Sequence, residues 1–147
     1  MPYSRLFYHF VWATHNRLSL INQSNRETLY AAMRAKVTEL GGITHALNGP
    51  EDHVHLVATV PPKIALATFI GQVKGSSSHL ASRLSVEAFA WQSEYGVLSV
   101  SESHLPVVVR YVVEQQKRHA ENRLNPRLEQ WGDQESPSLT PKRKRSD

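Results

Sequence analysis

Two histidines separated by a single residue are the feature of the sequence most suited to chemistry. His53 and His55 lie in the segment EDHVHLVATV, residues 51–60. In a β-strand, residues two apart share a face, so both imidazoles project together while the alternating apolar residues fill the other side. Two imidazoles can bind one divalent ion, but they leave its ligand set incomplete. The pattern therefore predicts either hydrogen-bonded core histidines or a metal site with a third ligand from elsewhere.

A tyrosine and a glutamine at helical spacing are candidates to complete such a site. The segment RYVVEQQKRH and the residues after it place four polar side chains on one helical face: Tyr111, Gln115, Arg118 and Asn122. A phenol forms covalent intermediates when a nearby cation stabilises its phenolate, and an amide oxygen can bind the same cation. The same residues also fit a tyrosine at a packing boundary beside a solvated glutamine. Gln116 could exchange roles with Gln115, although only Gln115 lies one helical turn beyond Tyr111.

The elements that must position these side chains follow from hydrophobic periodicity. Strands are predicted for RLFYHFVWAT, ITHALN, HVHLVATV and YGVLSV, which cover residues 5–14, 43–48, 53–60 and 95–100. A helix is expected after Ser24, whose side chain should cap the amide of Glu27. A second helix is expected over residues 64–84, where apolar residues recur at helical spacing.

A third helix is predicted to carry the tyrosine. Ser103 and Pro106 indicate its start, because proline fits a first helical turn, and it should continue to about Asn122. The order of elements predicts an α+β fold of the ferredoxin-like sandwich type. In this fold an antiparallel four-stranded sheet carries packed helices, here with an additional C-terminal helix that bears Tyr111.

Composition restricts the class of protein. The 147 residues suit one domain, expected over residues 1–125, followed by a flexible basic tail over residues 126–147. No run approaches the roughly 20 apolar residues of a membrane helix, and no signal peptide is evident, so a cytoplasmic location is expected. The absence of cysteine excludes disulfides, thiolate nucleophiles and cysteine zinc sites.

The net charge of +4 permits a polyanionic partner. The basic run at 142–145 is either solvated or in contact with phosphates.

Four segments in this order resemble one family, the single-tyrosine HUH transposases of the smallest bacterial insertion sequences and their relatives tied to repetitive palindromic elements. The resemblance covers residues 3–122. EDHVHLVATVPP resembles the family's histidine, hydrophobe, histidine strand with its preceding aspartate, here Asp52, and its following proline pair. IGQVKGSSSHL resembles the family's second helix, and EYGVLSVSES resembles its fourth strand. RYVVEQQKRH resembles the helix whose tyrosine is the nucleophile and whose glutamine completes the metal site.

The resemblance implies a metal-dependent tyrosine transposase, which is an endonuclease and strand transferase for single-stranded DNA. His53, His55 and Gln115 would hold Mg²⁺ or Mn²⁺, and Tyr111 would attack a phosphate at an element end marked by a hairpin. The products would be a 5′-phosphotyrosine link and a free 3′-OH, so a second strand can be joined without ATP. Members of the family are homodimers in which the tyrosine helix can serve the partner's histidines. Tyr111 and His53 are therefore expected to be able to act from different chains.

Side chains for DNA contact are less well defined by the sequence. Lys74 and Ser76 lie in KGSSS, which offers a cation, hydroxyls and a flexible backbone to phosphates. Arg17 and Arg118 are further candidates, as is His119, which lies where the family often has paired histidines. No pattern specifies a target base sequence.

Two other classes of protein fit part of the pattern. A domesticated protein would bind single-stranded or hairpin DNA without transposition, and an assay of transposition in cells would separate it from a transposase. A metal-dependent phosphodiesterase would use the histidine pair to activate water and would form no covalent adduct. Such an enzyme normally has more histidine or aspartate ligands near the pair than HVH provides.

Overall fold

The computed structural model describes residues 3–84 and 89–132. Its α-helices are α1 Arg26–Glu39, α2 Leu66–Leu84, α3 Leu105–Val113 and α4 Gln115–Ala120. Its strands are β1 Phe7–Ala13, β2 Ile43–Asn48, β3 His53–Thr59 and β4 Gly96–Val100. Two short 3-10 helices, η1 His15–Arg17 and η2 Pro126–Leu128, follow β1 and α4. The four predicted strands and the second helix all form within a few residues of the expected bounds.

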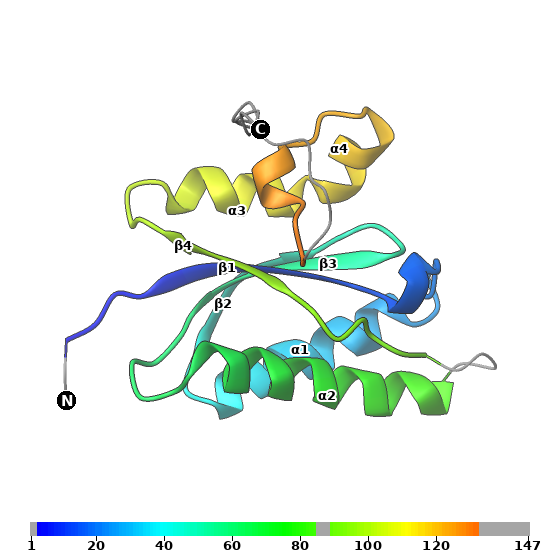
Figure 1. Ribbon diagram of the computed structural model, residues 1–147, viewed down its shortest axis with the longest axis horizontal. Helices are drawn as coiled ribbons and strands as arrows, with labels where there is room; N and C mark the ends of the chain where they lie inside the picture. The colour runs from blue at the N-terminus through cyan, green and yellow to red at the C-terminus, as the bar shows by residue number, and fades with distance from the viewer. Residues whose placement is uncertain (1–2, 85–88, 133–147) are drawn as a thin grey trace, which may run out of the picture.

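The strands form one antiparallel sheet in the order β2-β3-β1-β4. The central strands β1 and β3 are far apart in sequence, and their register sets Val11 opposite His55 and Ala13 opposite His53. Figure 1 shows α1 and α2 together below the sheet, and α3 and α4 above it. This arrangement confirms the predicted α+β fold of the ferredoxin-like type.

Each face of the sheet builds its own apolar cluster, and strand alternation decides which side chains each cluster receives. The larger cluster joins the sheet to α1 and α2; it includes Phe10, Trp12, Met33, Val54, Leu56 and Phe69. The smaller cluster lies under α3 and consists of Ala46, Val57, Val108, Tyr111 and Val112. Because Val54 and Leu56 fill the larger cluster, the alternating residues His53 and His55 face α3, as the sequence predicts.

Two details of the predicted helices are wrong. Ser24 does not cap α1, because its hydroxyl donates to Asn22 Oδ1 at 2.5 Å, and the helix begins at Arg26 without a side-chain cap. The third helix is not continuous to Asn122. Its first part, α3, ends before Glu114, a short α4 continues to Ala120, and Asn122 has a left-handed backbone with φ of 56°.

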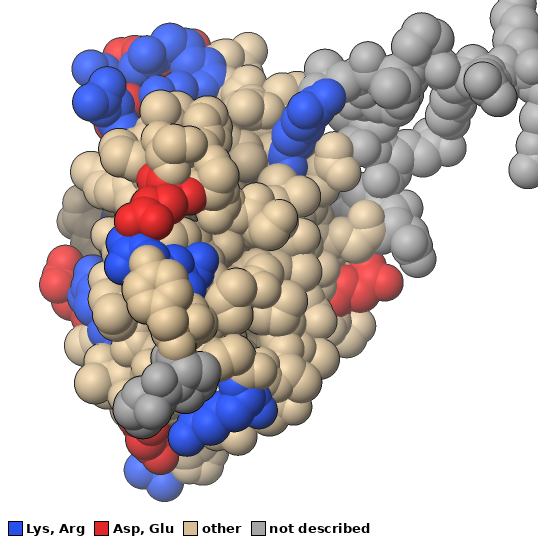
Figure 2. All heavy atoms as spheres, turned by 90° about the vertical axis from the view of Figure 1, so that its left-hand side faces the viewer, with Lys and Arg blue, Asp and Glu red and all other residues tan. Residues whose placement is uncertain are grey.

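Among the described residues, the Lys and Arg side chains seen in Figure 2 lie in separate groups beside acidic ones and form no single basic face in that view. The basic run at 142–145 lies outside the described residues, and the domain boundary at residue 125 stays a prediction. Within residues 3–84 and 89–132, no helix combines the length and apolar character needed to cross a membrane.

Candidate metal and nucleophile site

Strand β3 buries the two histidines side by side. His53 and His55 expose 1% and 0% of their surface, and their ring centroids are 5.1 Å apart. Each ring has a polar partner at Nδ1: Asp52 Oδ1 lies 2.8 Å from His53 Nδ1, and His9 Nε2 lies 2.9 Å from His55 Nδ1. Partners at Nδ1 fix the orientation of an imidazole and leave Nε2 as the nitrogen that faces a ligand. Both Nε2 atoms face the space under α3.

Two further residues support these histidines: His9, which the sequence does not place at the site, and Arg17, which it predicts only as a DNA contact. His9, on β1, is 1% exposed and stacks on His55 with centroids 5.1 Å apart. Arg17 donates to Asp52 Oδ2 at 3.1 Å, so it holds the carboxylate that orients His53. Burial, together with the neighbouring His55, lowers the pKa of His9 to about 3, so its ring is neutral at ordinary pH.

Helix α3 places the predicted nucleophile next to the histidines in the same chain. Tyr111 is 5% exposed, and its ring centroid lies 6.0 Å from that of His55. Gln115 begins α4, is fully buried, and accepts a hydrogen bond at Oε1 from His119 Nε2 at 2.9 Å. Gln116 points elsewhere, since its amide donates to Asn48 Oδ1. The structure therefore brings Tyr111 and Gln115 to the histidines and leaves Gln116 outside.

A carboxylate from the end of the described chain lies at the centre of this group. Glu129 follows η2, and its Oε1 is 3.0 Å from His53 Nε2, 3.3 Å from His55 Nε2 and 3.1 Å from His119 Nε2. The hydroxyl of Tyr111 donates to Glu129 Oε2 at 2.6 Å. Ligand atoms of His53, His55, His119 and Glu129 all lie within 4.8 Å of one another, which is a geometry suited to a metal ion.

The segment that carries Glu129 is fixed by further contacts. The backbone amide of Asn125 donates to the Tyr111 hydroxyl at 3.0 Å. Trp131 is 2% exposed and packs on His53 with ring centroids 4.9 Å apart, while the Arg17 guanidinium lies 5.0 Å above the indole. Residues 125–131 thus cover the Tyr111 hydroxyl and the open side of the histidine pair.

The charge states follow from these contacts. Although burial opposes ionisation, hydrogen bonds from His119, His53 and His55 hold the pKa of Glu129 far below its usual value. Burial and the Glu129 carboxylate raise the pKa of Tyr111, so its phenol stays protonated in this arrangement. Burial lowers the pKa of His55, whereas for His53 the carboxylates of Asp52 and Glu129 outweigh burial and raise the pKa.

The residues predicted to contact DNA lie in two places. Arg17, Arg118 and His119 are at the site: Arg17 pairs with Asp52, and the Arg118 guanidinium lies 4.8 Å above the Tyr111 ring and pairs with Glu114. Lys74 and Ser76 are on α2, across the sheet from Tyr111 (Figure 1). There the Lys74 ammonium donates to the Gln92 carbonyl at 2.6 Å, and the Ser76 hydroxyl donates to the Val73 carbonyl at 2.8 Å.

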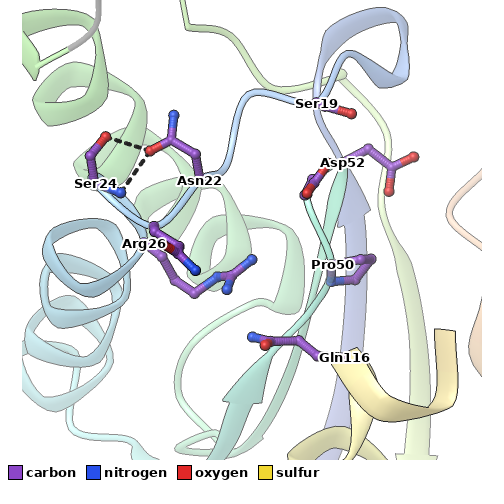
Figure 3. A pocket seen from close by; sticks show the side chains of 9 residues that line it. Ser19, Asn22, Ser24, Arg26, Pro50, Asp52 and Gln116 are labelled. Carbon is purple, nitrogen blue, oxygen red and sulfur yellow. Dashed lines mark hydrogen bonds between the residues drawn. The ribbon is translucent and has the colours of Figure 1, made fainter. Parts of the chain in front are cut away.

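A polar pocket of about 790 Å³ adjoins the site through Asp52. Figure 3 shows it between the start of α1 and the turn before β3, with the Arg26 guanidinium on one side and the Gln116 amide on the other. Ser19, Asn22 and Ser24 add hydroxyl and amide groups to its wall. Such a lining suits a polar or anionic group better than an apolar ligand.

Comparison with known proteins gives one consistent result. The family model described as "Transposase IS200 like" matches residues 2–115. A protein assigned as a transposase from Deinococcus radiodurans R1 superposes with a TM-score of 0.63 and 25% identity, over 78% of this chain and 95% of the other. A REP-associated tyrosine transposase bound to a REP hairpin superposes with a TM-score of 0.63 and 16% identity, over 81% of this chain and 74% of the other, and shows a shared fold. A search of curated proteins gave no match.

Proposed function

The chain belongs to the IS200-like transposase family, and from this premise we propose that it cleaves and rejoins single-stranded DNA with Tyr111 as the nucleophile. One observation carries the proposal. The Tyr111 hydroxyl and the Nε2 atoms of His53 and His55 all lie within hydrogen-bond distance of the same carboxylate, that of Glu129. A nucleophile and two metal-ligand atoms that meet at one point are what a phosphoryl transfer at that point needs.

The proposed reaction is a transesterification. The Tyr111 oxygen forms a bond to the scissile phosphorus, and the bond from phosphorus to the 3′ oxygen breaks. The phenol gives up its proton, and the leaving 3′ oxygen takes up a proton and becomes a 3′-OH. The other strand stays on Tyr111 as a 5′-phosphotyrosine. Attack by another 3′-OH reverses the chemistry and rejoins DNA. For the forward step, Tyr111 must exchange its hydrogen bonds with Glu129 and Asn125 for contact with the phosphate.

His53, His55 and Gln115 would hold the divalent ion, Mg²⁺ or Mn²⁺. When bound, such an ion polarises the scissile phosphate and stabilises its developing charge. The residues fit this role: both histidines have partners at Nδ1 that direct Nε2 inward, and the Gln115 side chain is fully buried beside them. Gln115 Nε2 has no hydrogen-bond partner among the described residues, and rotation of the amide would set its oxygen at that unpaired position instead.

Assembly and DNA recognition extend the proposal. The Tyr111 and His55 rings are in contact within one chain, so we infer that a single subunit contains a complete site. The homodimer stays a prediction, which sedimentation can test.

We propose a hairpin next to the cleavage site as the recognised element, in line with the REP hairpin bound by the structural relative. Arg118 and His119 are then the candidate DNA contacts at the site, with Arg17 beside them and Lys74 and Ser76 more distant. A cytoplasmic location also stays a prediction.

Replacement of His9 should weaken the centre without loss of the fold. His9 orients His55 from a neighbouring strand, and loss of such a supporting partner typically lowers metal affinity about 10–100-fold. We expect His9→Ala to lower the affinity for Mn²⁺ by this factor, measured by titration calorimetry. Tyr8→Phe is the matched control, because Tyr8 neighbours His9 on β1 but packs on the opposite face. Equal Mn²⁺ affinity of His9→Ala and wild type would contradict the role.

The function itself is tested by incubation of the protein with hairpin-bearing oligonucleotides and Mn²⁺ or Mg²⁺. A flexible single strand can be led past a fixed tyrosine more easily than a stacked duplex. We therefore expect a protein-DNA species that survives denaturant with single-stranded substrate and none with the perfect duplex. Hairpin binding without any adduct would favour the domesticated DNA-binding protein. Cleavage without an adduct would favour a water-activating phosphodiesterase.

A further inference from the structure

The centre contains a carboxylate that neither β3 nor the tyrosine helix provides. Glu129 comes from the segment after η2, and its side chain is 13% exposed. Its two oxygens together approach three imidazole nitrogens and the Tyr111 hydroxyl. A largely buried anion with four donors around it is fully paired in the metal-free protein, so the contacts alone are compatible with a structural role. The distances and the charge balance indicate that Glu129 is also suited to bind a metal ion.

The distances fit a ligand position. When ligand atoms lie about 2.0–2.3 Å from a metal ion, adjacent ligand atoms of the shell are roughly 3.0–3.5 Å apart. Glu129 Oε1 lies 3.0 Å from His53 Nε2, 3.3 Å from His55 Nε2 and 3.1 Å from His119 Nε2. The carboxylate oxygen is therefore spaced from all three nitrogens as one corner of a coordination shell is spaced from its neighbours.

The charge balance points the same way. Histidine and glutamine ligands are neutral, so His53, His55 and Gln115 leave both charges of a divalent ion uncompensated. Mg²⁺ and Mn²⁺ favour carboxylate oxygens, and an anionic ligand raises affinity. Among the described residues that could hold an ion here, Glu129 is the one acidic member of the cluster.

The position of Glu129 does not depend on the histidines alone. Trp131, two residues on, is buried with Val11 and Ala13 of β1. The carbonyl oxygen of Gln130 lies against Gly96, where an added Cβ would overlap it, so β4 is shaped to accept this segment. On the other side, Asn125 holds η2 by accepting from the Arg127 amide and donates its own amide to Tyr111. A carboxylate held by packing on both sides is preorganised for an ion.

We propose that Glu129 is an anionic ligand of the divalent ion held by His53 and His55. The segment over residues 125–131 then belongs to the metal centre and supplies the negative charge that the strand and helix ligands lack. This inference rests on the proposed function for the presence of the ion. If Glu129 is a ligand, its replacement lowers the affinity for the metal ion. If the carboxylate only occupies the position of the ion, it competes with the metal, and its replacement raises the affinity.

Mn²⁺ titration of the full-length protein without DNA tests the proposal, by calorimetry and by the loss of the free Mn²⁺ signal in electron paramagnetic resonance. We expect Glu129→Gln and Glu129→Ala each to lower Mn²⁺ affinity by at least about 10-fold, since replacement of even an outer-shell partner has effects of this size. Glu121→Gln is the matched control, because Glu121 pairs with Arg123 at the surface and is not a member of the cluster. Circular dichroism verifies that each variant is folded.

The outcomes separate this inference from the proposed function. Weaker binding by both Glu129 variants and by His53→Ala supports the ligand role. Weaker binding by His53→Ala, with unchanged or tighter binding by the Glu129 variants, would overturn the role of Glu129 and keep the histidine site. Unchanged binding by all three variants would overturn the metal centre as well.

Discussion

Tyr111→Phe is expected to abolish DNA cleavage and adduct formation. The substitution removes one oxygen, the proposed nucleophile, and keeps the ring that packs on Val108 and Val112. Loss of a nucleophile commonly lowers turnover on the order of 10⁴-fold or more, because no neighbouring group can take over the covalent step. Gel analysis of a labelled hairpin oligonucleotide under denaturing conditions measures both products.

The control for this variant is Tyr95→Phe. Tyr95 lies before β4 and packs on the larger apolar cluster, on the other side of the sheet from Tyr111. Its hydroxyl has no part in the proposed chemistry, so cleavage by Tyr95→Phe should match wild type. Wild-type cleavage by Tyr111→Phe would remove Tyr111 as the nucleophile.

His53→Ala and His55→Ala should each lower cleavage by at least about 10²-fold, more than the loss of an outer-shell partner would. Each variant removes one Nε2 atom that is a proposed ligand of the metal ion, and the remaining ligands cannot hold the ion in place. Hairpin binding and thermal stability should change much less, because the apolar clusters stay filled. Initial rates at limiting Mn²⁺ measure the effect, and His45→Ala on the adjacent β2, where the ring contacts Thr59, is the control. Retained cleavage by either variant at limiting metal would exclude the metal assignment.

A mixture of the two inactive proteins tests where the site is assembled. Tyr111 and His55 contact within one chain, so a mixture of Tyr111→Phe with His53→Ala should stay inactive. Recovered cleavage would mean that the tyrosine helix of one chain serves the histidines of another, as in the dimers of the family that the sequence resembles.

Local periodicity is sufficient to predict the strand and helix residues of the site. Alternation in β3 requires His53 and His55 to share a face once Val54 and Leu56 are buried. The spacing of one helical turn likewise brings Tyr111 and Gln115 to the same side, even though the helix breaks at Glu114, a break for which the sequence carries no glycine or proline signal.

The rest of the site depends on contacts between distant segments. His9 and His55 are 46 residues apart, and His53 and Glu129 are 76 apart, so no spacing rule joins them. The sequence carries only weak signals for His9 and Glu129. His9 is a polar residue inside an otherwise apolar strand, and Glu129 lies close to a buried tryptophan in a stretch that composition assigns to a tail. His9 and Glu129 reach the candidate site because β1 and the chain after α4 both pass beside it, which only the folded structure shows.

Peptide mapping of the covalent protein-DNA species tests the central claim most directly. After incubation with a single-stranded hairpin substrate and Mn²⁺, protease digestion and mass spectrometry identify the residue that carries the nucleotide. We predict a 5′-phosphate linked to Tyr111 and a released strand that ends in a free 3′-OH. A nucleotide attached to any other residue, or cleavage with no attached nucleotide, would contradict the account.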